Sequence, residues 1–141
     1  MPPLKLAEAL QLEEHDICDV KAVIATVGPL KKVFSKGTRE WYDLRELSLL
    51  DDSKTMVKLS VWETFAKRSF TEGDVGCVLL AQRCCWLPYG DIARFNLLSS
   101  GGYVKCPPTR DAAELLAWLQ TDPSDLTVYN ERARSGHSVN F

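Results

Sequence analysis

The sequence has few of the residues that metal sites and catalytic centres require. Its two histidines, His15 and His137, lie at opposite ends of the 141 residues, and its five cysteines include no C-x-x-C pair. Zinc sites use closely spaced Cys and His ligands, so no metal is expected here. P-loop, G-x-S-x-G and H-E-x-x-H motifs are also missing. We therefore predict no enzyme activity, no cofactor and no small-molecule substrate.

The sequence also lacks an excess of charge and a long apolar run. Its 17 basic and 19 acidic residues leave a formal net charge of −2. This balance argues against a strongly basic chromatin-type protein but not against a local basic groove. No run approaches the roughly 18 apolar residues of a membrane span, and residues 1–5 do not resemble the start of a secretory signal. We expect an intracellular protein, or a domain of one, without membrane attachment.

What the sequence does contain is a series of short segments with the composition of β-strands. Five segments combine apolar and β-branched residues, and turn-forming residues such as Gly28-Pro29 and Ser99–Gly102 end them. Residues 30–40, between the first two segments, are predicted to be a basic loop. The predicted strands are Val20–Val27, Trp41–Leu50, Met56–Trp62, Val75–Gln82 and Ile92–Leu98.

Two helices complete the predicted architecture. Residues 63–70 predict a short helix, and residues 111–120 carry an apolar stripe at helical spacing after the N-cap Thr109. This order of elements is typical of an all-β, five-stranded OB-fold barrel, with a short helix between strands three and four and a C-terminal helix. A small β-sandwich or an SH3-like barrel is the structural alternative. The barrel is assigned to residues 17–121, after an N-terminal arm or short helix (1–16) and before a polar tail (122–141).

The third predicted strand carries the most informative side chain, Trp62. Because strand side chains alternate with period two, Leu59 and Val61 fall on one face of the strand, and Lys58 and Trp62 fall on the other. The apolar set is the core set, so Trp62 lies on a polar, basic face. It either covers the barrel end and the following helix, or forms a stacking platform for a nucleic-acid base, worth about 1–3 kcal/mol. Lys58 is then placed to contact a phosphate.

The loop before the fifth strand is a second source of aromatic side chains. Trp86 and Tyr89 surround a turn signal at Tyr89-Gly90-Asp91, so at least one ring is expected to be exposed. Trp86 either takes part in stacking or covers a barrel mouth. In the fifth strand, Arg94 and Asn96 alternate with apolar residues and are predicted to face away from the core.

Basic residues are frequent around these positions. Lys32, Lys36 and Arg39 lie in the predicted basic loop, and Lys58 and Arg94 lie in strands. Any one of them is a normal solvated surface residue. Together, beside a groove, they are predicted to follow a phosphate backbone.

These segments resemble a known family. Leu49–Ser53 followed by Val57–Glu63 resembles the strand–turn–strand of the second DNA-binding OB domain of the replication protein A large subunit, where the pattern runs "Leu-x-Asp-x-Ser-Gly" into "Val-x-x-x-Leu-Trp-Gly". Phe95–Ser100, with the later helix, resembles the exit from strand five of that domain. The opening Ile17–Val20 is similar also to the related X-linked single-strand-binding protein. The resemblance extends over residues 17–120.

The resemblance implies a binding module rather than an enzyme. The stacking aromatic of the family at the end of strand three falls on Trp62, and its second aromatic falls close to Tyr89, with Trp86 as the alternative. The family has paired glycines after the second aromatic, whereas only Gly90 follows Tyr89 here. The implied partner is single-stranded DNA, together with proteins of a nuclear genome-maintenance complex.

One alternative function stays open at this point. The barrel serves instead as a protein-interaction or assembly domain, in keeping with the net acidity and with an expected exposed apolar patch at Cys84-Cys85-Trp86. RNA or telomeric-strand binding is a weaker possibility, since it uses the same groove.

Overall fold

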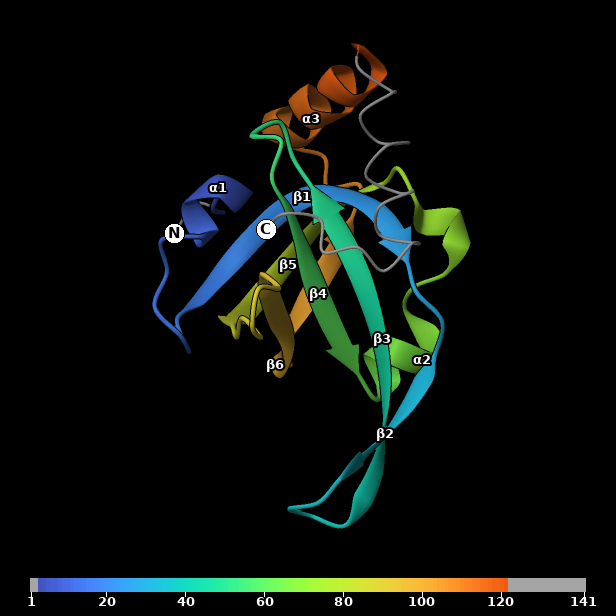
Figure 1. Ribbon diagram of the computed structural model, residues 1–141. Helices are drawn as coiled ribbons and strands as arrows, with labels where there is room; N and C mark the ends of the chain where they lie inside the picture. Colours follow the sequence, from blue (N-terminus) through green and yellow to red (C-terminus); the bar gives the residue numbers. More distant parts are fainter. Residues whose placement is uncertain (1–2, 122–141) are drawn as a thin grey trace.

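Six strands form one sheet that curls back on itself (Figure 1). This computed structural model describes residues 3–121. The strand order is β1-β5-β6-β4-β3-β2, and an added pairing of β1 with β3 closes five of the strands into a barrel. Among the strands of residues 3–121, the β4–β6 pair is parallel and the other strand pairs are antiparallel. The strands are β1 (Ile17–Val27), β2 (Lys31–Ser35), β3 (Glu40–Leu50), β4 (Met56–Trp62), β5 (Val78–Trp86) and β6 (Arg94–Lys105).

Alternating side chains build the core of this barrel. Leu59 and Val61 of β4 and Phe95 of β6 are fully buried in the main apolar cluster, as the alternation predicts. The short helix α2 (Thr64–Arg68) follows β4, and the 3-10 turn η1 (Glu72–Asp74) leads into β5. The predicted OB-type barrel, with its helix between the third and fourth barrel strands and its C-terminal helix, is confirmed.

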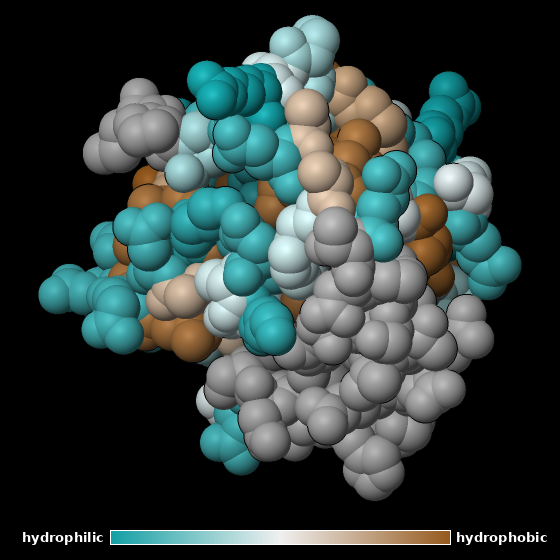
Figure 2. Space-filling view, turned by 90° about the horizontal axis from the view of Figure 1, so that it is seen from above, coloured by the Kyte–Doolittle hydropathy of each residue, from teal (hydrophilic) through white to brown (hydrophobic). Residues whose placement is uncertain are grey.

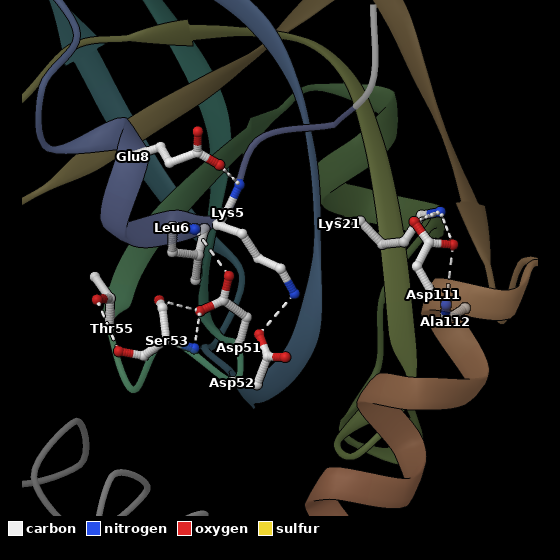
Figure 3. A network of polar contacts seen from close by, with 10 residues as sticks. All are labelled: Lys5, Leu6, Glu8, Lys21, Asp51, Asp52, Ser53, Thr55, Asp111 and Ala112. Carbon is white, nitrogen blue, oxygen red and sulfur yellow. Dashed lines mark hydrogen bonds and ion pairs between the residues drawn. The ribbon is translucent and has the colours of Figure 1, made fainter.

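Two helices close the end of the barrel that lies away from the β2–β3 hairpin (Figure 1). In α1 (Leu6–Ala9), the Leu6 amide donates 2.8 Å to the buried Asp51 carboxylate, which also accepts from the amide and hydroxyl of Ser53 (Figure 3). The helix α3 (Arg110–Thr121) is attached by an ion pair of 2.8 Å between Asp111 and Lys21 of β1. Apolar contacts of Ala112 and Leu115 with β1 and β5 add to this attachment.

Several strand boundaries differ from the sequence prediction, among them the first residues of β1, β5 and β6. Three differences bear on the site. Residues 30–40 are not a loop, because Lys31–Ser35 pair with Glu40–Leu44 as a hairpin. The strand β5 continues to Trp86, so this residue lies in a strand and not in the loop. The strand β6 continues through Ser99–Gly102 to Lys105, because it pairs with β5 along this stretch. At Gly101 an added Cβ would lie 2.2 Å from the Gln82 carbonyl oxygen, so this glycine permits close strand pairing instead of ending the strand.

Seen from the α3 end, the visible part of residues 3–121 shows many hydrophilic side chains, with hydrophobic residues in several separate areas between them (Figure 2). Within residues 3–121, no helix has the length and apolar character needed to cross a bilayer. In the same range, no three His, Cys, Asp or Glu side chains gather as they would around a metal ion. The predicted tail, 122–141, lies outside the described residues, and the predicted domain boundaries stay predictions.

Candidate functional site

The outer face of β3, β4 and β6 gathers several of the predicted site residues. Lys58 of β4 lies opposite Arg94 of β6, and Ser60 lies opposite Asn96. The indole Nε1 of Trp62 donates a hydrogen bond of 3.4 Å to the side-chain oxygen of Asn96. The tryptophan, the amide and the two basic side chains therefore share one face of the sheet, as the alternation predicts.

A cavity of about 700 Å³ lies beside Trp62. Its walls include Val33 and Tyr42 of the β2–β3 hairpin and Asn96 and Leu98 of β6. Its size is within the range of small-ligand sites. Aromatic and apolar walls with a few polar groups suit a flat ring that has polar edges, so the cavity is compatible with a nucleobase.

The backbone at Glu63, directly after Trp62, is strained. Its φ of 55° and ψ of −120° fall in a region that favours glycine, and glycine is the residue at this position of the family pattern. Two contacts with Asp43 hold the conformation: the Glu63 amide donates 2.9 Å to the Asp43 carbonyl, and the Glu63 carboxylate accepts 3.1 Å from the Asp43 amide. The strain therefore lies at the rim of the Trp62 cavity.

A second cavity, of about 540 Å³, adjoins the same face at Lys58. Lys31 and Glu46 also line it and form an ion pair of 3.5 Å. Burial lowers the pKa of Lys58, while the nearby Glu46 carboxylate acts in the opposite direction. Desolvated cations of this kind gain most from an anionic ligand, because the surrounding protein screens them less than water does.

Two hydroxyl groups on this face have no hydrogen-bond partner within the described part of the chain. They belong to Ser48 and Ser60, which are 0% and 1% exposed. Unpaired buried hydroxyls are unfavourable unless water or a ligand serves them. Ser48 pairs with Lys58 and Ser60 with Asn96 across the strands, so both hydroxyls belong to this polar face although neither is open to solvent.

Tyr89 and Arg94 lie together at the edge of the same face. Tyr89 is 70% exposed, and the Arg94 guanidinium carbon lies 5.7 Å from its ring centroid. Arg94 also donates 3.2 Å to the Leu87 carbonyl, which fixes its direction. The predicted turn is present, because Tyr89 and Ile92 exchange backbone hydrogen bonds and Gly90 adopts a φ of 57°.

Trp86 is a correction to the predicted site. It is 5% exposed, belongs to the core and packs edge-on against Phe95 with ring centroids 4.9 Å apart. Its ring therefore has no free face for a base, and it serves as a covering residue. The neighbouring Cys84 and Cys85 are 0% and 7% exposed, so the apolar patch expected at Cys84-Cys85-Trp86 does not exist on the surface.

The predicted basic residues of the hairpin are not all directed to the cavity. Lys32 forms an ion pair of 3.0 Å with Asp43, on the hairpin face opposite to Val33 and Tyr42. Lys67 of α2 contacts the same carboxylate at 3.0 Å, and hydrogen bonds from these two lysines lower the pKa of Asp43. Two further predicted residues lie exposed at the hairpin turn: Lys36 and Arg39.

The sequence interpretation missed the hairpin residues, above all Tyr42, Phe34 and Trp41. A signal was present, since the strand-favouring pairs Val33-Phe34 and Trp41-Tyr42 flank a short segment that contains Gly37, which is the pattern of a hairpin. Glu63 was missed as well, because its unusual backbone is visible only in three dimensions.

The sequence matches a family model described as "Replication protein A OB domain" over residues 6–84. No curated protein matches the chain significantly.

Solved structures show the same fold at low sequence identity. A replication protein A heterotrimer bound to ssDNA matches with a TM-score of 0.78 and 21% identity, covering 87% of this chain and 29% of the other. The second OB-fold domain of replication protein A from Methanococcus maripaludis matches with a TM-score of 0.57 and 16% identity, covering 73% of this chain and 95% of the other. Fission yeast Pot1 with ssDNA matches with a TM-score of 0.64 and 12% identity, over 90% of this chain and 49% of the other. The chain thus spans about a third of the replication protein A chain that it matches.

Proposed function

Because the chain belongs to the replication protein A OB-domain family, we propose that it is a single-stranded DNA-binding module of a replication, repair or recombination protein. The observation that carries this proposal is the position of Trp62, half-buried at the wall of a largely apolar cavity on the outer face of the barrel. Solved structures of the same fold include a replication protein A heterotrimer and Pot1 with ssDNA, which supports the choice of ligand.

In this proposal Trp62 stacks on a base inside the cavity, with Asn96 holding the indole and contacting base edges. Tyr89, steadied by Arg94, stacks on a second base. Lys58 and Arg94 lie opposite each other and neutralise phosphates. Binding by stacking and charge predicts weak sequence preference and a strong dependence on salt.

The proposed module binds and does not catalyse. Its partners are single-stranded DNA and the other proteins of a genome-maintenance complex, and a nuclear location follows from such a role. An assembly domain without DNA binding is the other candidate. The burial of Cys84 and Trp86 removes the apolar patch that had favoured it.

Fluorescence anisotropy with a labelled oligo-dT of about 20 nucleotides tests this proposal, with a duplex of equal length as the control. We expect binding to the single strand only. With the two phosphate contacts of Lys58 and Arg94, a fourfold rise in salt weakens binding by roughly sevenfold. The variant Trp62→Ala should bind at least about fivefold more weakly, which corresponds to the loss of one stacked base. Absence of binding at low salt would refute the proposal in favour of the assembly domain.

A further inference from the structure

The two faces of the β2–β3 hairpin present different aromatic side chains. Val33 and Tyr42 line the Trp62 cavity. Because neighbouring strand residues alternate, Phe34 and Trp41 point to the opposite face. They pair directly across the two strands, with ring centroids 5.2 Å apart and planes inclined by 60°.

This aromatic pair is exposed to an unusual degree. Phe34 is 45% exposed and Trp41 is 64% exposed, and neither ring is part of an apolar cluster within residues 3–121. Figure 1 shows the hairpin extending beyond the barrel, and β2 pairs only with β3 in the described sheet. Exposed rings on an edge strand favour aggregation, and proteins usually avoid them unless they bind something.

Positive charges flank the pair on both sides. Towards the barrel lie Lys32 and Lys67, which share the single carboxylate of Asp43 and remain 69% and 51% exposed. Beyond the pair, at the turn, lie the exposed Lys36 and Arg39. Cations on both sides of stacking surfaces complement an anionic strand that has free bases, whereas they do not suit a purely apolar partner.

We infer that Phe34 and Trp41 form a second base-stacking surface, which holds a single strand that passes from the Trp62 cavity across the free edge of β2. This inference rests on the proposed function, because the ligand is the same single strand. Trp41 offers the larger free ring to a base, and Phe34 supports it from the neighbouring strand. Lys36 and Arg39 contact phosphates on the turn side of the pair, and Lys32 and Lys67 contact phosphates on the barrel side.

The surface predicts an effect that depends on the length of the oligonucleotide. An oligo-dT on the order of 5 nucleotides fills the Trp62 cavity alone, and one on the order of 15 nucleotides reaches both surfaces. In anisotropy titrations of the full chain, Trp41→Ala should weaken binding of the long oligonucleotide by about 5- to 100-fold and leave the short one unchanged. Phe34→Ala should act in the same direction more weakly.

Two controls separate this inference from the proposed function. Trp62→Ala should weaken the binding of both oligonucleotides. Leu10→Ala removes another exposed apolar side chain, 42% exposed and next to α1, and should change neither. Because Trp41 and Phe34 are exposed, both hairpin variants should melt at the wild-type temperature.

The outcomes distinguish a failure of the proposed function from a failure of the second stacking surface. If the wild type binds neither oligonucleotide, the proposed function is wrong. If the wild type binds both and Trp62→Ala weakens both, but Trp41→Ala and Phe34→Ala bind the long oligonucleotide as the wild type does, only the second surface is refuted. A loss that is equal for both lengths also refutes it, because the hairpin rings would then act within the first cavity.

Discussion

The hairpin side of the barrel and the end closed by α1 and α3 use similar residues in opposite ways. On the hairpin side, Trp41 is 64% exposed, and the cationic side chains of Lys36 and Arg39 lie exposed at the turn. At the closed end, Lys21 is 8% exposed and paired with Asp111, and Asp51 is fully buried with three donors around it (Figure 3). Polar groups are thus paired internally where α1 and α3 cover the barrel, whereas Trp41, Lys36 and Arg39 of the hairpin remain exposed to a ligand.

The largest expected loss of stability separates Trp86, which lies in the core, from Trp62, which lies on the open face. Trp86→Ala should lower the free energy of unfolding by about 3–5 kcal/mol, because it leaves a void beside Phe95 in the core. Trp62→Ala, on the open face, should lower it by less than about 1 kcal/mol. Urea denaturation measures both values. Equal losses for the two variants would show that Trp62 is a core residue and would break the comparison.

A smaller loss is expected at the closed end from Asp51→Ala. The variant leaves the Leu6 and Ser53 amides without their acceptor. The free energy of unfolding should therefore fall by about 2–3 kcal/mol. The adjacent Asp52→Ala is the matched control: it removes only an exposed ion pair with Lys5, worth at most about 1 kcal/mol. Urea denaturation, together with hydrogen exchange of the Leu6 amide, tests this, and similar losses for both variants would contradict it.

On the hairpin side of the barrel, we expect one substitution to increase the stability of the fold. Glu63→Gly relieves the strained backbone after Trp62 and should raise the free energy of unfolding by about 1 kcal/mol, even though the hydrogen bond from the Asp43 amide is lost. Glu63→Ala loses the same bond and keeps the strain, so it should destabilise. Thermal melting of the two variants shows whether each is more or less stable than the wild type. A Glu63→Gly protein less stable than the Glu63→Ala protein would show that no strain is stored here.

The smallest effect is a pH dependence at the closed end. Hydrogen bonds from Lys21 and Thr109 lower the pKa of Asp111 from 3.8 to about 2. A carboxyl with a lowered pKa stabilises the fold above its unfolded value and loses this contribution as the pH falls through its folded value. The melting temperature of the wild type should therefore exceed that of Asp111→Asn near neutral pH, and the gap should close between about pH 4 and pH 2. Because Asp111 is half exposed, the gap should be small. A gap that persists at the lowest pH would contradict the ion-pair explanation.

The strands and their inward faces could be predicted from local pattern. The alternation of Leu59 and Val61 with Lys58 and Trp62 identified the core face of β4, because the two-residue period is a property of any strand. The position of Trp86 could not be predicted in the same way. Its segment reads as a loop from Pro88 and Gly90, and the pairing with β6 on one side and with Asp16 on the other extends β5 to include it.

The sequence by itself determined the barrel class, the order of the five barrel strands and the outer position of Trp62, since these depend on periodicity and on turn-forming residues along the chain. It did not determine the strand β2, which was predicted to be a loop. The tertiary structure alone decided which of the aromatic and basic side chains are available to a ligand. It buried Trp86, paired Lys32 with Asp43 and placed Trp41 on the free face of a hairpin. Exposure and ion pairing arise from contacts between residues distant in the chain, and a one-dimensional pattern does not specify those contacts.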